Sequence, residues 1–253
     1  MEVNIFRNVE SLAAAAADFT GRRIGEALRE RGHANILMAT AASQLAFMKS
    51  LLALDIDWDR ISVFHLDEYK GLTSDHPASF RKILQDHFLS FVHPGELFLI
   101  RGEAADSSAE TGRYSRLLAA HPIDVACIGI GENGHIAFND PHVADFDDPA
   151  MVKVVDLDEA CRRQQVWEGW FPALSDVPAE AYSLTIPAIM KSRSVSCVVP
   201  GHRKAEAVFN TLTGPLDTAC PASVLRTHSD AMLFLDADSA AKLRGTPFDL
   251  PIQ

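Results

Sequence analysis

"ISVFHLDEYKGL", residues 61–72, reads as a β-strand that ends on two adjacent acidic side chains. The run from Ile61 to Leu66 is rich in β-branched, aromatic and aliphatic residues, which is typical of a strand. Asp67 and Glu68 follow it directly. Such a pair indicates either an ordinary loop, in which one acid is solvated or caps a helix, or a functional site at the end of the strand.

Similar apolar runs recur along the chain and alternate with helical patterns. Strands are predicted at residues 35–40, 61–66, 96–100, 124–130, 152–155, 194–199 and 231–236. Helices are predicted from a period near 3.6 at residues 46–54, 79–88, 111–118 and 204–212, and a further amphipathic helix at 11–23. This alternation predicts an α/β fold, a mostly parallel twisted sheet with helices on both faces, of the Rossmann-like type.

No repeat, low-complexity tract or Gly/Ser linker interrupts the 253 residues, so a single domain over 1–253 is expected. The stretch 139–150, with two prolines and four aspartates, is predicted to be a long loop. Several of the strands are nearly all apolar, as they must be when helices cover both faces of a sheet.

The composition restricts the partners of the protein. Lys and Arg total 23 against 34 Asp and Glu, a formal charge of -11, which argues against nucleic acid and anionic membranes as partners. No apolar run is long enough to span a bilayer. Four scattered cysteines without a C-x-x-C pair favour reduced thiols and a cytoplasmic location. Glu2 and Glu10 precede the alanine-rich stretch 11–23, which disfavours a signal peptide.

A glycine-rich loop, "GIGENGHIAFNDP" at 129–141, follows another predicted strand. Gly129, Gly131 and Gly134 match the dinucleotide pattern G-x-G-x-x-G, and Asp156 lies near the expected spacing, so a nicotinamide dehydrogenase is a competing hypothesis. That fingerprint needs a helix directly after the glycines to hold the pyrophosphate. The residues after Gly134 have no helical period, so the match is interpreted as incidental.

The same loop presents His135, and Asp140 follows five residues later. Imidazole titrates near neutrality and a nearby carboxylate can orient it, so the two residues are a candidate proton-transfer pair. A structural histidine is the plainer alternative. Metal binding is disfavoured because no second His or Cys stands at ligand spacing. Because parallel strands present their ligands at their carboxyl ends, Thr40, Asp67 and Gly131 are expected to converge there.

Several longer stretches together resemble the glucosamine-6-phosphate deaminase/isomerase family, whose superfamily includes 6-phosphogluconolactonase. The stretches are "FHLDEYKGL…HPASF" (64–80), "GIGENGHIAFNDP" (129–141), "YSLTIPAIM" (182–190), "VPGHRKAEAV" (199–208) and "CPASVLRTH" (220–228). Lactonases of the superfamily typically carry DER and GHTAS where this chain has Asp67-Glu68-Tyr69 and residues 134–138. Both differences favour the deaminase branch.

The resemblance implies that the enzyme converts glucosamine 6-phosphate and water to fructose 6-phosphate and ammonia, without metal or organic cofactor. Asp67 matches the base that moves the proton from C2 to C1, and His135 with Asp140 matches the ring-opening group. The family's phosphate-binding loop corresponds to Thr40, Ala41, Ala42 and Ser43 and its phosphate-binding lysine to Lys204. The expected partner is a small hexosamine phosphate, and the resemblance allows a homo-oligomer.

Departures from the family pattern leave alternatives open. Asn133 belongs to the catalytic group by position, but typical members have an aspartate there, and asparagine cannot exchange a proton. The phosphate loop lacks the usual glycine, and Gln165 stands where the family has a phosphate-binding arginine, with Arg162 one turn earlier as a substitute. The alternatives are galactosamine 6-phosphate or another phosphosugar aldose–ketose conversion, and a non-catalytic sugar-phosphate sensor.

Overall fold

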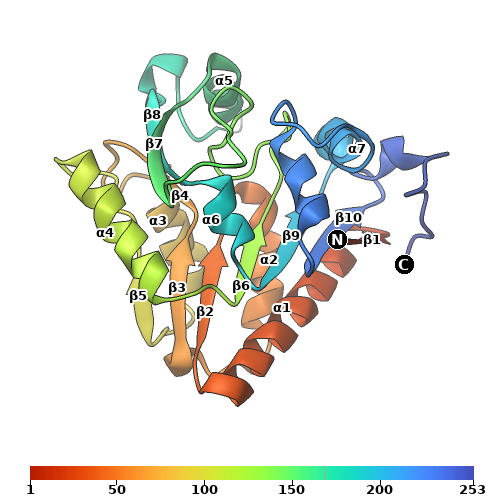
Figure 1. Ribbon diagram of the computed structural model, residues 1–253, viewed down its shortest axis with the longest axis horizontal. Coiled ribbons are helices and arrows are strands. Elements are labelled where there is room, and N and C mark those ends of the chain that lie inside the picture. Colours follow the sequence, from red (N-terminus) through yellow and green to blue (C-terminus); the bar gives the residue numbers. More distant parts are fainter. Residues whose placement is uncertain (168) are drawn as a thin grey trace.

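The computed structural model describes residues 1–167 and 169–253, and its centre is a seven-stranded parallel sheet (Figure 1). The strands are β1 (Glu2–Phe6), β2 (Ala34–Met38), β3 (Ile61–His65), β5 (Glu96–Phe98), β6 (Val125–Ile128), β9 (Ser194–Val199) and β10 (Ala231–Asp236). Their spatial order is β1-β10-β9-β6-β2-β3-β5, and every neighbouring pair is parallel. The predicted α/β fold with a mostly parallel sheet is confirmed.

Helices cover both faces of this sheet. One face carries α1 (Val9–Arg31), α2 (Leu45–Leu52), α3 (Phe80–Leu84) and a following π-helical turn (Gln85–Leu89); the other carries α4 (Ser107–Ala120), α6 (Ile186–Met190) and α7 (Ala205–Thr213). The side chains of a strand alternate between the two layers: Ile36 and Met38 join the core under α1 and α2, and Leu37 joins the core under α4 and α6. This arrangement explains why β2, β3, β6 and β9 are buried at every position.

A second, antiparallel sheet lies beyond the carboxyl ends of the main one, at the upper left of Figure 1. It consists of β4 (Asp67–Tyr69), β8 (Glu180–Leu184) and β7 (Val152–Asp156), in that spatial order. Helix α5 (Glu159–Trp167) follows β7 in the chain. The predicted strand at 152–155 exists but belongs to this sheet. Asp67 and Glu68 do not leave β3 as a loop, because they form β4 by pairing with β8. Strands β1 and β8 were not predicted, since neither has a clear apolar run.

The chain changes direction at β2. It proceeds from β2 to β3 and β5 on one side, then returns to β6, β9 and β10 on the other. At such a switch point the connections leave neighbouring strands in opposite directions and open a crevice at the carboxyl ends. The loop after β6 has no helix between residues 131 and 151, so the structure lacks the helix that a dinucleotide fingerprint requires, and 139–150 is irregular as predicted.

The two ends of the chain meet at the outer edge of β1 (Figure 1). The Gln253 amide donates to the Ile5 carbonyl at 2.8 Å, and the Arg7 amide donates to the Gln253 carbonyl at 3.1 Å. Within the described residues no helix is both long and apolar enough to cross a membrane. All four cysteines carry free thiols, in agreement with the sequence.

Candidate active site

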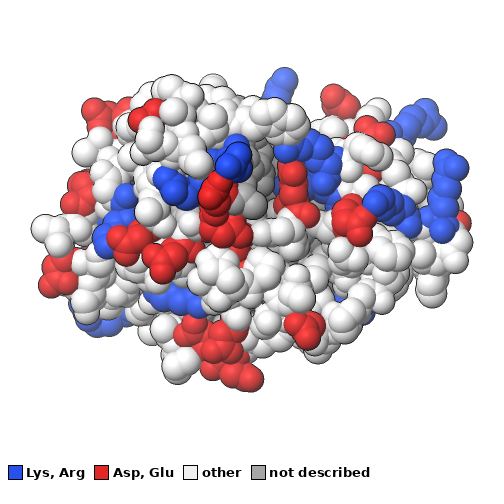
Figure 2. Space-filling view, turned by 90° about the horizontal axis from the view of Figure 1, so that it is seen from above, with Lys and Arg blue, Asp and Glu red and all other residues white. Residues whose placement is uncertain are grey.

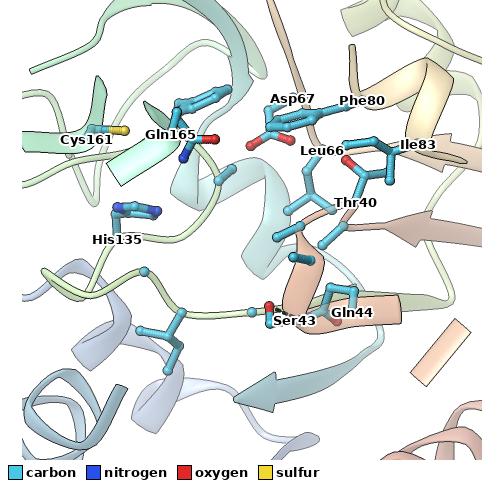
Figure 3. A pocket seen from close by; sticks show the side chains of 18 of the residues that line it. Thr40, Ser43, Gln44, Leu66, Asp67, Phe80, Ile83, His135, Cys161 and Gln165 are labelled. Carbon is cyan, nitrogen blue, oxygen red and sulfur yellow. Dashed lines mark hydrogen bonds between the residues drawn. The ribbon is translucent and has the colours of Figure 1, made fainter. Parts of the chain in front are cut away.

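A cavity opens at the carboxyl ends of β2, β3, β6 and β9, around the switch point (Figure 3). Its walls include the predicted residues Thr40, Ala41, Ala42, Ser43, Asp67, His135 and Lys204. Asp140 and Asn133 do not line this cavity but lie behind His135, in contact with it. The fold therefore gathers segments from four separate strand ends at one place, as expected for a parallel sheet.

The two acids of the opening motif have different environments. Glu68 is fully buried and accepts hydrogen bonds from the Ser79 hydroxyl at 2.7 Å and from the backbone amides of Phe80 and Arg81 at 3.1 Å each. It also forms an ion pair with the Arg81 side chain at 3.2 Å. Burial raises the pKa of Glu68, and these hydrogen bonds partly offset that rise. Glu68 thus holds the start of α3 in place.

Asp67 instead faces the cavity (Figure 3). Its backbone pairs with Ser183 of β8, and no described residue donates a hydrogen bond to its carboxylate. The residue is only 9% exposed, so burial, followed by the charge of Glu68, raises the pKa of its carboxyl group well above the usual aspartate value. A carboxylate with raised pKa and free oxygens is suited to accept a proton from a bound molecule.

Two glycines shape the loop that carries His135. The Gly131 amide donates to the His135 carbonyl at 2.9 Å, and Gly134 turns the chain with φ 86°. A Cβ at Gly131 would lie 2.2 Å from the His135 ring, so only glycine leaves room for the imidazole. Ala137 has φ 50°, a left-handed conformation that is unfavourable for alanine. Asn139, fully buried, donates to the carbonyls of Ile136 and Leu184 at 2.9 and 2.8 Å and closes the loop.

His135, Asp140 and Asn133 lie together as one group of polar side chains. The Nδ1 atom of His135 lies 2.8 Å from Asp140 Oδ1, and Asn133 Nδ2 donates to the same oxygen at 2.8 Å. Asn133 Oδ1 accepts from the His135 amide at 3.1 Å. Burial alone would raise the pKa of Asp140, but the contacts with His135 and Asn133 outweigh it and lower that pKa. Asp140 therefore stays ionised beside the imidazole, and Asn133 supports it as a neutral donor.

The predicted phosphate loop connects β2 to α2. Thr40 is 2% exposed and its hydroxyl has no hydrogen-bond partner among the described residues. Neither Ala41 nor Ala42 has a positive φ, so the loop does not need the glycine that the family usually has there. Lys204 reaches the cavity from a turn that begins at Gly201, where φ is 94° and the amide donates to Asp236. Figure 2 shows acidic and basic side chains interspersed on the face above, so an anion would be held by local contacts.

Some residues of the cavity were not singled out in the sequence. Gln44, Cys161 and Trp170 line it together with the apolar side chains of Leu66, Phe80, Ile83 and Phe138. Burial strongly raises the pKa of the Cys161 thiol, which keeps it neutral. These residues meet at the cavity from distant parts of the chain, and no local sequence pattern identifies them as cavity residues.

Gln165 also lines the cavity, whereas Arg162 is engaged elsewhere. The guanidinium of Arg162 donates to the carbonyls of Leu174 and Val177, both at 2.8 Å. The expectation that Arg162 substitutes for the family's arginine is therefore wrong. Among the described residues no group of three or more His, Cys, Asp or Glu side chains could hold a metal ion.

Known proteins match this chain over most of its length. The family model for glucosamine-6-phosphate isomerases/6-phosphogluconolactonase matches residues 7–234. A glucosamine-6-phosphate deaminase of Listeria innocua is 38% identical over 213 residues, which are 84% of this chain and 89% of that protein. A relative of the same name from Streptococcus pneumoniae is 35% identical over 226 residues, 88% of this chain and 95% of that protein.

Solved structures agree with this result. A structure described as a monomeric glucosamine-6-phosphate deaminase superposes with a TM-score of 0.88 and 32% identity, over 95% of this chain and 99% of that one. A 6-phosphogluconolactonase from Shewanella baltica has a TM-score of 0.75 at 18% identity over 93% of this chain and 97% of that one, which shows a shared fold. The resemblance seen in the motifs is confirmed: the chain belongs to the glucosamine-6-phosphate isomerase/6-phosphogluconolactonase family.

Proposed function

We propose that the protein is a glucosamine-6-phosphate deaminase, which converts glucosamine 6-phosphate and water to fructose 6-phosphate and ammonia. The observation that carries this proposal is a single cavity with the Asp67 carboxylate on one wall and His135, which contacts Asp140 behind it, on another. The hydroxyl-bearing residues Thr40 and Ser43 line the same cavity, and so does Lys204 from another segment. The names of the relatives, at up to 38% identity, support the same substrate.

The proton transfers follow from the geometry of the two groups. His135, oriented by ionised Asp140, moves a proton between the ring oxygen and the anomeric hydroxyl, which opens the sugar ring. Asp67 then takes the proton from C2 of the open-chain amino aldehyde and returns it to C1, while a proton passes from the amino nitrogen to the C1 oxygen, so that the 2-amino aldose becomes the C2 imine of fructose 6-phosphate. Water adds to the resulting C2 imine, and ammonia leaves with the proton that the addition releases. Asn133 holds Asp140 ionised, so its lack of an exchangeable carboxyl does not remove the pair.

The phosphate end of the substrate is assigned to the loop of Thr40, Ala41, Ala42 and Ser43 and to Lys204. The Thr40 hydroxyl is buried without a described partner, and an oxygen of the phosphate would supply one. A buried polar group left unpaired is unfavourable, so a ligand that satisfies it gains affinity.

The test of the reaction is ammonia release from glucosamine 6-phosphate and galactosamine 6-phosphate, with solvent deuterium incorporation followed by NMR. The wild type should release ammonia, and Asp67→Asn should lose C2 proton exchange while still binding the phosphosugar. Glu68→Gln is the matched control, because it removes the neighbouring carboxylate, which does not face the cavity. Wild-type binding without ammonia release would favour a sensor, and exchange at the wild-type rate in Asp67→Asn would remove Asp67 from the mechanism.

The assignment of Lys204 has its own test. Lys204→Ala should raise KM more than it lowers kcat, because a phosphate contact far from the reacting carbons is mostly uniform binding. The loss of one charge-assisted contact costs about 1.5–3 kcal/mol, roughly 10- to 150-fold in affinity. An unchanged KM would place the phosphate elsewhere.

We further propose that residues 1–253 form one domain and that the enzyme works in the cytoplasm, where sugar phosphates are metabolised and free thiols persist. The expectation of a homo-oligomer stays a prediction, and one solved relative is described as monomeric. Light scattering of the purified protein would determine the mass of the assembly.

A further inference from the structure

Gln44 lies at the floor of the cavity and joins two of its walls. The residue is 1% exposed. The Nε2 atom donates to the Val198 carbonyl at 3.1 Å and to the Ser43 hydroxyl oxygen at 3.3 Å. A Cβ at Gly129 would lie 2.8 Å from the same nitrogen, so the amide can cross the end of β6 only over glycine. This residue was not selected in the sequence and has no role in the proton transfers.

The Val198 carbonyl fixes the orientation of the Gln44 amide. A carbonyl can only accept, so the amide must present its nitrogen there, and its oxygen points elsewhere. The Gln44 oxygen is buried and has no hydrogen-bond partner among the described residues. Both hydrogens of Nε2 are then used, one by Val198 and one by Ser43.

This orientation determines what the Ser43 hydroxyl can do. Since the oxygen of Ser43 accepts a hydrogen from Gln44, its own hydrogen must point away from that amide. Ser43 is half-buried and lines the cavity (Figure 3). The hydroxyl is therefore prepared as a donor toward a ligand, and an anionic oxygen is the acceptor that profits most from such a bond.

Gln44 also fixes the spacing of the two segments that border this end of the cavity. Val198 is near the end of β9, and the turn that carries Lys204 follows that strand. Ser43 belongs to the loop that follows β2, and β6 separates β2 from β9 in the sheet. The single amide thus connects the loop and the turn across an intervening strand.

We propose that Gln44 is a positioning residue that orients the Ser43 hydroxyl as a hydrogen-bond donor to the phosphate of the substrate. The proposal rests on the proposed function, because it assigns the phosphate to this end of the cavity. Gln44 touches no reacting atom, and its effect is expected on substrate capture more than on the chemical steps.

The test compares Gln44→Met, Gln44→Glu, Ser43→Ala and the double variants that combine a Gln44 substitution with Ser43→Ala. Methionine keeps the length of the side chain without its donors. Glutamate places a carboxylate beside the Val198 carbonyl and accepts the Ser43 hydrogen, which turns that hydrogen away from the ligand. We expect KM to rise about 3- to 10-fold in Gln44→Met and more in Gln44→Glu, each by a larger factor than kcat falls.

Coupling to Ser43 separates positioning from a general loss of structure. In the Ser43→Ala background, Gln44→Met should raise KM much less than it does in the wild type, because the hydroxyl that it orients is gone. Gln85→Met, on the exposed surface, is the control and should leave KM at the wild-type value. Equal effects of Gln44→Met in both backgrounds, or parallel losses in KM and kcat, would overturn the proposal.

A second readout does not depend on turnover. Inorganic phosphate should raise the melting temperature of the wild type, and the rise should be smaller in Gln44→Met and Gln44→Glu. If the wild type releases no ammonia but this phosphate effect still depends on Gln44, the proposed reaction fails and the role of Gln44 stands. If the wild type turns over and the Gln44 variants match it in KM and in the phosphate effect, only the role of Gln44 fails.

Discussion

Asp67 and Glu68 show how adjacent residues of the same chemistry acquire different functions. Successive side chains of a strand point to opposite faces, so β4 directs Asp67 to the cavity and Glu68 toward the start of α3. The place of Asp67 after a strand left an ordinary loop acid and a functional residue both open; the family resemblance selected Asp67 as the base, and that role stays a prediction. The role of Glu68 could not be predicted, because its partners Ser79 and Arg81 are 11 and 13 residues away and meet it only through the turn between β4 and α3.

Asp67→Asn should stabilise the protein at neutral pH. The folded state raises the pKa of Asp67, so ionisation of Asp67 disfavours folding; this penalty is absent below the unfolded pKa near 3.8 and grows as the pH rises to the folded pKa. The variant removes it. Urea unfolding at pH 4 and pH 8 should show a larger gain in free energy for the variant at pH 8. An equal difference at both pH values would contradict the assigned environment of Asp67.

Asn133→Ala should shift the pH dependence of the reaction. The hydrogen bond from Asn133 is one of the contacts that lower the pKa of Asp140 against the effect of burial, so its loss raises that pKa. Asp140 would then ionise at higher pH, and the acid limb of kcat against pH should move upward. Asn133→Asp should move it further, because it adds a second carboxylate beside the first.

The measurement is kcat with glucosamine 6-phosphate from pH 3 to pH 9 for the wild type and both variants, because the pKa of Asp140 in the wild type lies below the usual aspartate value. Asn210→Ala, on the surface of α7, is the control and should leave the profile in place. Identical acid limbs in the wild type and both Asn133 variants would show that Asn133 does not act on Asp140.

At the scale of elements, long apolar or periodic runs were predictable and short ones were not. The strands at 194–199 and 231–236 were predicted with the bounds that β9 and β10 have. Strands β4 and β8 exist because they pair with each other beyond the main sheet, and that pairing is a tertiary contact with little local signal. The position of Gln44 was hidden for the same reason: its partner Val198 is 154 residues away.

His65, the last residue of β3, should make the fold sensitive to acid. Burial, followed by the charges of Arg81 and Arg113, lowers its pKa from 6.5 to about 3, and neither ring nitrogen has a described hydrogen-bond partner. Below pH 6.5 the His65 imidazole is protonated in the unfolded chain, whereas in the folded protein it stays neutral down to about pH 3. Stability should therefore fall as the pH decreases through this window, by about 1.4 kcal/mol per pH unit from this group.

His65→Leu keeps a similar volume and removes the titration. The free energy of unfolding in urea, measured from pH 6 to pH 4.5, should decrease less steeply in this variant than in the wild type. His93→Asn changes an exposed histidine and should keep the wild-type slope. Equal slopes in His65→Leu and the wild type would mean that His65 is protonated in the folded protein.

At the scale of the whole molecule, the parallel order of the sheet places four strand ends around one cavity, and this could be predicted from the alternation of strands and helices. The pairing of the chain's last residues with the edge strand β1 could not be predicted. Strand β1 lies at that edge, and residues 252 and 253 pair with its free side through Ile5 and Arg7. The contact joins residues that are more than 240 positions apart, and no local pattern encodes it.

Deletion of residues 251–253 should loosen this edge without affecting the cavity. Two backbone hydrogen bonds are lost, each contributing about 0.5–1.5 kcal/mol. Amide hydrogen exchange in residues 1–8 should become faster, and exchange in β6, the central strand of the sheet, should stay as in the wild type. Unchanged exchange in residues 1–8 would show that β1 does not depend on these residues.

The pairing of β1 with β10 also has a consequence for the growing chain on the ribosome. Strand β1 is synthesised well before β10, its neighbour in the main sheet, so it has no partner in that sheet until residues 231–236 have been made. Helix α1 packs on β9 and β10 as well, and its apolar face stays partly uncovered for the same interval. We therefore expect a nascent chain to expose an apolar helix face and an unpaired strand until β9 and β10 have been made, and such surfaces are prone to aggregation.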